Sequence, residues 1–355
     1  MKIIAYFEGE YNPYRGKFLN AIRRYKKDCL IGVVSYMPSN TLQNYLHEHN
    51  INLFTSLEQI KDSFTHFVIT LLDFNHLTEM YNICNGIENL LAFSRNKHIR
   101  IVNGTFRYLG DYFPGYADLI WDIRKIDPEY QPEYFKDELR HKNAQLRILT
   151  VGTDSNIGKM TVGLELERVL CKKNYDVKFI ATGQIGIFLK GEGISLDSTI
   201  IDFSRGMLEE HILNYDNEIL IIEGQGSIFH PVFFGTATTL LNGAAPHLMI
   251  MCSRMGQKYN RTVPDWPIPV YPEAIKKTEE VARKVIPDSK IIAMTVNTSE
   301  INHDEAALFE LQQLEYQLEL PVSDAVRFGV DKLTLAIEKV FENKIRSVYN
   351  STLPT

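Results

Sequence analysis

The segment between Leu146 and Leu170 carries the strongest sign of chemistry in the sequence. It reads LRILTV, GTDSNIGKMT and VGLELERVL, an apolar run followed by a glycine-rich loop and an amphipathic stretch, which is the context of a phosphate-binding loop. Gly152 permits a tight turn, Gly158 lets the backbone approach a phosphate closely, and Lys159, which we expect to be exposed, adds a positive charge. We predict that the phosphates of a nucleotide or of a nucleotide-containing cofactor bind to Gly152, Thr153, Asp154, Asn156, Gly158, Lys159, Met160 and Thr161.

Two features separate this loop from the common phosphate-loop pattern. Five residues rather than four lie between Gly152 and Gly158, and Met160 stands where a serine or threonine hydroxyl usually holds Mg²⁺. A thioether is a poor ligand for a hard cation, and Thr161 is rotated by about 100° around the helix from that position. We therefore expect the loop to bind a diphosphate, and we predict no metal site.

A carboxylate and an imidazole follow a second apolar run. Glu223 ends the run EILIIEG and is followed by Gly224 and Gly226, and His230 lies seven residues beyond it. The carboxyl end of a strand beside a phosphate loop lies in the crevice where α/β sheets bind ligands. We predict that Glu223 and His230 are catalytic, with His230 as general base. The alternatives are a carboxylate that caps the glycine turn and a structural histidine.

Three further loops hold candidates for ligand contacts. Gln184 belongs to TGQIGIFLKGEGISLD, which we expect to be a glycine-rich loop, and Arg254 and Arg261 belong to the basic segment CSRMGQKYNRTVPDWPIP. We predict that these three residues bind the substrate, since a basic loop can hold a phosphate or a carboxylate; solvated loops are the alternative. Arg327 in SDAVRFGVD follows a short apolar run, and we predict that it binds the cofactor at the adenine.

The elements that position these residues form two series. Residues 1–145 alternate the runs IIAYF, CLIGVVSY, HFVIT and IRIVN with helical patterns at 41–49 and 76–92, and a polar linker at 126–145 precedes the second series. Such alternation predicts parallel sheets. The fold class is therefore α/β, with a Rossmann-like parallel-sheet domain over 1–135 and a doubly wound domain like those of P-loop NTPases over 146–345. The first domain lacks GxGxxG, so we expect no dinucleotide site there.

Composition limits the class of partner. The 355 residues are 45% hydrophobic and 23% charged, as in a globular enzyme, and the net charge of −6 argues against a nucleic-acid partner. No apolar run reaches the roughly 20 residues that span a bilayer, so we expect no membrane partner. The four cysteines lack metal-ligand spacing. We predict a cytoplasmic homo-oligomer whose partner is a small molecule.

Six separated motifs resemble one known family. GTDSNIGKMT, ATGQIGI, EGQGSIFHP, APHLMIMC, the loop 261–269 and LPVSDAVRFG occur in order and are similar to those of the former domain-of-unknown-function family that includes D-glutamate N-acetyltransferase. A more distant likeness is to the P-loop proteins related to dethiobiotin synthetase. The resemblance covers most of residues 118–340.

This resemblance implies an N-acetyltransferase that moves an acetyl group from acetyl-CoA to the amine of an amino acid or a related small amine. It places Gly158 and Lys159 at the cofactor phosphate and Glu223 and His230 near the reacting amine. Two alternatives remain open: an ATP-dependent ligase or kinase that uses ATP with Mg²⁺, and a non-enzymatic nucleotide sensor.

Overall fold

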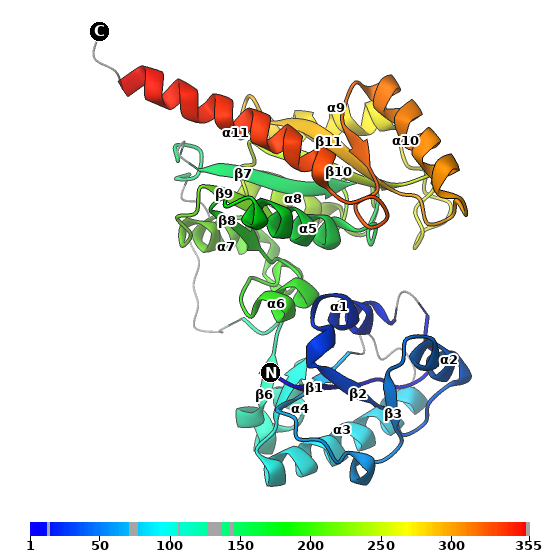
Figure 1. Ribbon diagram of the computed structural model, residues 1–355. Coiled ribbons are helices and arrows are strands. Elements are labelled where there is room, and N and C mark those ends of the chain that lie inside the picture. Colours follow the sequence, from blue (N-terminus) through cyan, green and yellow to red (C-terminus); the bar gives the residue numbers. More distant parts are fainter. Residues whose placement is uncertain (13–14, 71–76, 106, 127–136, 143–144, 353–355) are drawn as a thin grey trace. The chain divides into compact units, whose positions relative to one another are not determined.

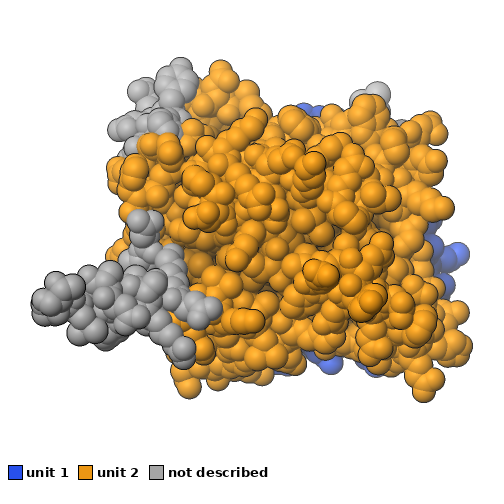
Figure 2. All heavy atoms as spheres, turned by 90° about the horizontal axis from the view of Figure 1, so that it is seen from above, with its two compact units in different colours: residues 1–127, 187–195 blue, residues 128–186, 196–355 orange. Residues whose placement is uncertain are grey.

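The computed structural model describes residues 1–12, 15–70, 77–105, 107–126, 137–142 and 145–352, without the side chains of 77–84 and 343–352 (Figure 1). The chain divides into two compact units, which Figure 2 distinguishes by colour. Unit 1 comprises residues 1–127 and 187–195, and unit 2 comprises 128–186 and 196–355. No pattern in the sequence predicted that residues 187–195, from the second half of the chain, belong to unit 1.

Unit 1 contains a six-stranded parallel sheet. Its strand order is β3-β2-β1-β4-β5-β6, the order of the doubly wound nucleotide-binding folds, which confirms the predicted Rossmann-like domain. The strands are β1 (Ile3–Tyr6), β2 (Leu30–Val34), β3 (Asn52–Phe54), β4 (His66–Ile69), β5 (Arg100–Asn103) and β6 (Ile120–Asp122). Prediction missed β3 and β6, because these three-residue strands are not fully buried and so lack an apolar run.

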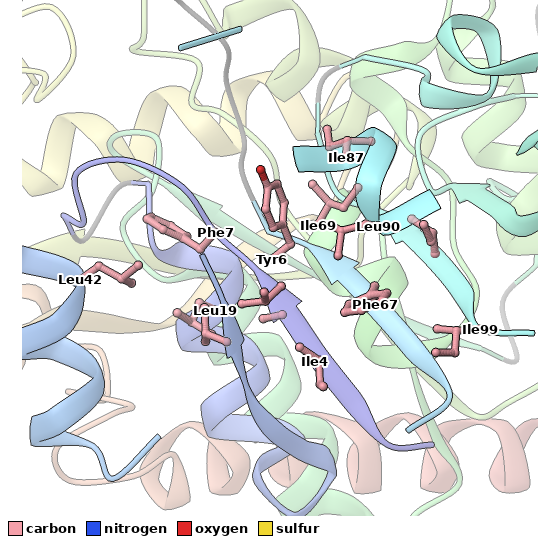
Figure 3. Close-up of a cluster of buried hydrophobic side chains, with 14 of the residues drawn as sticks. Ile4, Tyr6, Phe7, Leu19, Leu42, Phe67, Ile69, Ile87, Leu90 and Ile99 are labelled. Atoms are coloured by element: carbon pink, nitrogen blue, oxygen red, sulfur yellow. The ribbon is translucent and has the colours of Figure 1, made fainter. Parts of the chain in front are cut away.

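The core of unit 1 joins strands and helices. Its helices are α1 (Lys17–Tyr25), α2 (Asn40–Glu48), α3 (Leu77–Lys97) and α4 (Leu109–Tyr112). Ile4 and Phe67 from the sheet pack in one cluster with Leu19, Leu42 and Leu90 from the first three helices (Figure 3). Burial of such apolar side chains is the main favourable contribution to folding. The helical patterns predicted at 41–49 and 76–92 are confirmed as α2 and α3.

Unit 2 contains a second six-stranded parallel sheet, of order β12-β11-β10-β7-β9-β8. The strands are β7 (Leu146–Gly152), β8 (Val177–Ile180), β9 (Ile219–Ile222), β10 (Leu248–Arg254), β11 (Lys290–Asn297) and β12 (Val322–Ser323). The helices are α5 (Lys159–Lys172), α6 (Gln184–Lys190), α7 (Ile201–Leu213), α8 (Phe234–Gly243), α9 (Tyr271–Ala282), α10 (Asp304–Leu318) and α11 (Asp331–Thr352). None of the helices described is long and apolar enough to cross a membrane.

The strand order places helices on both faces of this sheet. The connection from β7 to β8 runs in one direction across the sheet, and the connections from β8 onwards run in the other. Right-handed crossovers therefore put α5 on one face and α7, α8 and α9 on the opposite face. The packing agrees, because α7 contacts α8, α8 contacts α9, and α11 contacts α5 (Figure 1). The predicted doubly wound domain is confirmed.

The segment around Gln184 differs from its prediction. Residues 184–190 form helix α6 rather than a glycine-rich loop. Ile187 and Phe188 of this short helix are buried, and Phe188 packs on Phe18 with ring centroids 5.2 Å apart. Tertiary burial therefore stabilises a helix that the local glycine content disfavours.

A buried arginine ties the predicted linker to β7. Arg147 is completely buried, and burial lowers its pKa to about 10, whereas Glu209 favours the charged form. Its guanidinium donates hydrogen bonds of 2.7–3.2 Å to the carbonyl oxygens of Leu139, Lys142, Ala244 and Ala245. Residues 127–136 and 143–144 of the predicted linker lie outside the described residues.

We expect Arg147→Met to destabilise the protein by about 3–5 kcal/mol, because the change leaves four carbonyls without their donor and Glu209 without its cation. Denaturant unfolding of the full chain measures this loss. Arg168→Met is the control, since that side chain is 52% exposed in its ion pair with Glu165 and such pairs contribute little. Equal losses in the two variants would contradict the role given to Arg147.

Candidate functional site

The phosphate loop has the predicted strand–loop–helix structure. Strand β7 ends at Gly152, and α5 begins at Lys159. Gly158 has a φ of 107°, a left-handed conformation that favours glycine. A Cβ atom on Gly152 would lie 2.6 Å from the side chain of Ile157. The backbone path thus requires glycine at 158, whereas Gly152 makes room for the side chain of Ile157. The N-terminus of a 14-residue helix faces the loop.

Lys159 is buried rather than exposed, contrary to expectation. Only 6% of the residue is exposed, and its Nζ donates a 2.8 Å hydrogen bond to the carbonyl oxygen of Asp154 inside the loop. Burial lowers the pKa of Lys159 to about 8, while Cys252, Asp154 and Glu223 favour the charged form. The lysine is therefore held within the loop as a cation that a phosphate can approach.

Asp154 connects the phosphate loop to the loop that follows β10. Its carboxylate is fully buried and accepts hydrogen bonds from the backbone N–H of Ser155 at 2.6 Å and of Arg261 at 3.1 Å, and from Gln257 Nε2 at 2.5 Å. His230 Nε2 lies 3.8 Å from the same carboxylate. One buried acidic side chain thus organises two loops at this edge of the sheet.

His230 lies in the site, but both its ring nitrogens are occupied. Nδ1 is 3.1 and 3.3 Å from the backbone N–H groups of Val232 and Phe233, and Nε2 is 2.7 Å from Thr262 Oγ1. A nitrogen that accepts two N–H groups carries no proton, so we assign the proton to Nε2. Burial lowers the pKa of His230, and nearby Asp154 opposes this. Its role as base stays a prediction, and these contacts favour the structural alternative.

Glu223 follows the end of β9 and is 3% exposed. Its Oε2 accepts hydrogen bonds from the backbone N–H groups of Thr182 at 3.0 Å and Gly183 at 3.2 Å. Burial raises the pKa of Glu223 to about 7, although these donors, Gln225 and Lys159 lower it. A carboxyl group with such a pKa can take up or release a proton at neutral pH.

Gly224 explains why Glu223 comes so near the phosphate loop. A Cβ atom at Gly224 would lie 1.6 Å from the carbonyl oxygen of Thr150 and 3.0 Å from Lys159 Cδ. The Gly224 N–H also donates a 2.9 Å hydrogen bond to Thr150 Oγ1. Only glycine lets the chain pass so close to β7, so this residue type brings the carboxyl group of Glu223 next to the loop.

The other predicted site residues fall into two groups. Arg254 and Arg327 are engaged elsewhere: Arg254 pairs with Glu300 at 2.9 Å, and the Arg327 guanidinium binds Asp304 at 2.5 Å and the carbonyl oxygen of Ile301 at 2.7 Å. Because both guanidiniums are already paired within the protein, the structure does not favour binding of a ligand by these two arginines. Their roles in ligand binding stay predictions.

The second group remains open to a ligand. Gln184 is 91% buried, and its Oε1 has no hydrogen-bond partner in the described part of the chain. Arg261 is exposed, and no described residue pairs with its side chain. Met160 and Thr161 are partly buried in the first turn of α5, and Asn156, with a φ of 56°, is exposed in the loop. Thr153 is the exception in this group, because it is fully buried and its Oγ1 lies 2.9 Å from Ser253 Oγ.

Sequence reasoning missed Gln257 and Thr262 as parts of the site. Both residues lie in the segment 252–269 that the sequence singled out, but neither carries a charge, so no local signal distinguished them from their neighbours. Their contacts with Asp154 and His230 span 103 and 32 positions of the sequence. Among the described residues, no three His, Cys, Asp or Glu side chains cluster as metal ligands would.

Comparison with known proteins identifies the family to which the second half of the chain is similar. A family model described as the DUF1611 P-loop domain, a domain of unknown function, matches residues 135–334. The chain belongs to the DUF1611 family. A DUF1611 family protein from Anabaena variabilis has a crystal structure with a TM-score of 0.81 and 27% identity, covering 96% of this chain and 100% of that one. The family resemblance and the two-domain fold class are thus confirmed.

Two similar proteins carry a functional name. A D-glutamate N-acetyltransferase from Pseudoalteromonas sp is 35% identical over 254 residues, which is 71% of this DUF1611 chain and 74% of the relative. A second D-glutamate N-acetyltransferase, from Tritonibacter scottomollicae, is 33% identical over 195 residues, which is 55% of this chain and 58% of that relative. The chain therefore spans about three quarters of one relative and less than two thirds of the other.

Proposed function

We propose that the protein is an N-acetyltransferase that moves an acetyl group from acetyl-CoA to the amine of a small amino acid. The observation that carries the proposal is the phosphate loop itself, in which Gly158 and the buried Lys159 can hold a diphosphate while Met160 occupies the magnesium position. Acyl transfer uses the diphosphate of coenzyme A only for binding. Two relatives are named D-glutamate N-acetyltransferase, which supports the reaction class and suggests a similar acceptor.

In this proposal the residues of the chain bind and orient the two substrates, and one of them removes a proton from the acceptor amine. Acetyl-CoA would supply the activated acetyl group, with the coenzyme A thiol as leaving group. Glu223 accepts the proton that the acceptor ammonium must lose before its nitrogen can attack, because the Glu223 pKa of about 7 suits this transfer at neutral pH. The second proton of the attacking amine goes to the departing thiolate. The exposed guanidinium of Arg261 binds the acceptor carboxylate. His230 positions the loop around Asp154.

The competing function is ATP-dependent phosphoryl or ligase chemistry with Mg²⁺ on Thr161 and Glu223. Titration with acetyl-CoA and with ATP, each with and without Mg²⁺, separates the two, together with mass spectrometry of D-glutamate after incubation. We expect magnesium-independent binding of acetyl-CoA and a gain of one acetyl group on the amino acid. Magnesium-dependent ATP hydrolysis at an ordinary enzymatic rate would contradict the proposal, and tight ATP binding without turnover would favour a sensor. Cytoplasmic location and homo-oligomerisation stay predictions.

A further inference from the structure

The side-chain amide of Gln257 has a fixed orientation. Its Nε2 lies 2.5 Å from Asp154 Oδ2 and 3.0 Å from the carbonyl oxygen of Tyr259. Both neighbours are acceptors, so the NH₂ end of the amide must face them and the oxygen must face away. Rotation of the amide by 180° would place Oε1 against a carboxylate and a carbonyl. The position of the Gln257 oxygen is therefore dictated by the phosphate loop.

This oxygen lacks a donor. Gln257 Oε1 is buried and has no hydrogen-bond partner within the part of the chain that the structure describes. Buried polar atoms are normally paired, so an unpaired one in a native structure marks a place where an ordered water, an ion or a ligand can bind. Oε1 itself is buried, but Gln257 as a residue is only partly buried, so this oxygen lies close to the surface. Asn260 Oδ1 also lacks a donor, but Asn260 is 1% exposed and lies beyond the reach of a ligand.

The same short segment presents a cation. Arg261 donates its backbone N–H to Asp154 Oδ2 at 3.1 Å, while its side chain is exposed and has no partner among the described residues. Asn260 Nδ2 holds the segment in place through the carbonyl oxygens of Phe229 at 3.4 Å and Trp266 at 3.2 Å. A hydrogen-bond acceptor and a guanidinium thus stand four positions apart on a segment that Asp154 and Asn260 fix.

We propose that residues 257–261 recognise the acceptor amino acid, with Gln257 Oε1 accepting a hydrogen bond from its amine and Arg261 binding its carboxylate. The diphosphate of a cofactor would satisfy the guanidinium but has no donor for the amide oxygen, whereas an amino acid carries both an N–H donor and a carboxylate. This assignment rests on the proposed acetyltransferase function and identifies the site of its acceptor. Gln257 is a positioning residue for the nucleophilic nitrogen, and Glu223 remains the proton acceptor.

The test separates recognition of the amine from recognition of the carboxylate. Calorimetry with the full chain and saturating coenzyme A measures the affinity for D-glutamate and for glutarate, which has the same two carboxylates and no amine. Gln257→Lys keeps a donor for Asp154 Oδ2 but has no acceptor oxygen. We expect this variant to lower the ratio of D-glutamate to glutarate affinity about tenfold, the effect of one hydrogen bond to a charged group. Arg261→Gln should weaken both ligands.

Asp265→Asn is the matched control, because Asp265 is exposed in the same loop and has no side-chain partner among the described residues. It should leave the affinity ratio unchanged. Failure of the wild-type protein to bind D-glutamate, or an unchanged ratio in Gln257→Lys, would overturn the assignment and leave Oε1 bonded to water. If D-glutamate binds with the expected ratios and no acetylated product forms, the proposed reaction fails while the amino-acid site stands.

Discussion

Lys159→Met is expected to lower the affinity for acetyl-CoA by about 10- to 100-fold, the effect of losing a charge-assisted hydrogen bond to phosphate. The same variant should fold at least as well as the wild type. Lys159 is buried and its pKa is lowered to about 8, so at neutral pH the folded protein must keep a charge away from water. Methionine fills a similar volume without that charge.

Two thermal measurements check this prediction. Without ligand, the melting temperature of Lys159→Met should equal or exceed that of the wild type. With acetyl-CoA, the upward shift seen in the wild type should be largely lost, because stabilisation by a ligand follows its affinity. Lys276→Met on α9 serves as the control for a lost charge, since that side chain is 78% exposed. If Lys159→Met binds both acetyl-CoA and ATP as the wild type does, the phosphate-loop assignment is wrong.

The local parts of the fold were accessible to prediction because short stretches of sequence determine them. The strand, glycine-rich loop and helix around Gly158 need only their own residues, and α5 begins directly after that glycine, at Lys159. All seven residues of β7 are buried, and the run LRILTV marks this strand in the sequence. Strand β3 is three residues long and α6 depends on burial of Phe188, so each required contacts that a local pattern does not contain.

The chemistry of the site was harder to predict from the sequence, because residues that are far apart along the chain determine it. The sequence predicted that Glu223 and His230 would lie near the phosphate loop, and the structure places them there. It did not predict that Val232, Phe233 and Thr262 would occupy both nitrogens of His230. Burial of Lys159 and the fixed amide of Gln257 also arise from tertiary packing. These contacts shift the preferred base from the histidine to the carboxylate.

Glu223→Gln is expected to lower the rate of acetyl transfer by roughly 10²–10⁴-fold, the usual contribution of a general base. Affinity for acetyl-CoA should change little. The glutamine oxygen can still accept the N–H groups of Thr182 and Gly183, which in the wild type lie 3.0 and 3.2 Å from Oε2. The variant therefore keeps the loop in place and loses only the capacity to take up a proton. Initial rates at saturating acetyl-CoA measure the effect.

The pH dependence gives the same prediction a second test. A base acts in its deprotonated form, and burial raises the pKa of Glu223 to about 7, so the wild-type rate should rise with pH through about 7 and then level off. This rising limb of the pH–rate profile should be absent in Glu223→Gln. Because the folded protein binds the proton of Glu223 more tightly than the unfolded chain, stability should fall as pH rises from the ordinary carboxyl pKa to about 7, and the variant should lack that fall.

His230→Asn distinguishes the two candidate bases. The asparagine oxygen can replace Nδ1 as acceptor for the N–H groups of Val232 and Phe233, which lie 3.1 and 3.3 Å from that nitrogen, but it cannot titrate near neutrality. We expect this variant to retain the limb near pH 7 and to lose less than roughly tenfold in rate, since general-base catalysis contributes far more. Loss of the limb in His230→Asn, with the limb kept in Glu223→Gln, would instead assign the proton transfer to His230 and require Nε2 to release Thr262 during turnover.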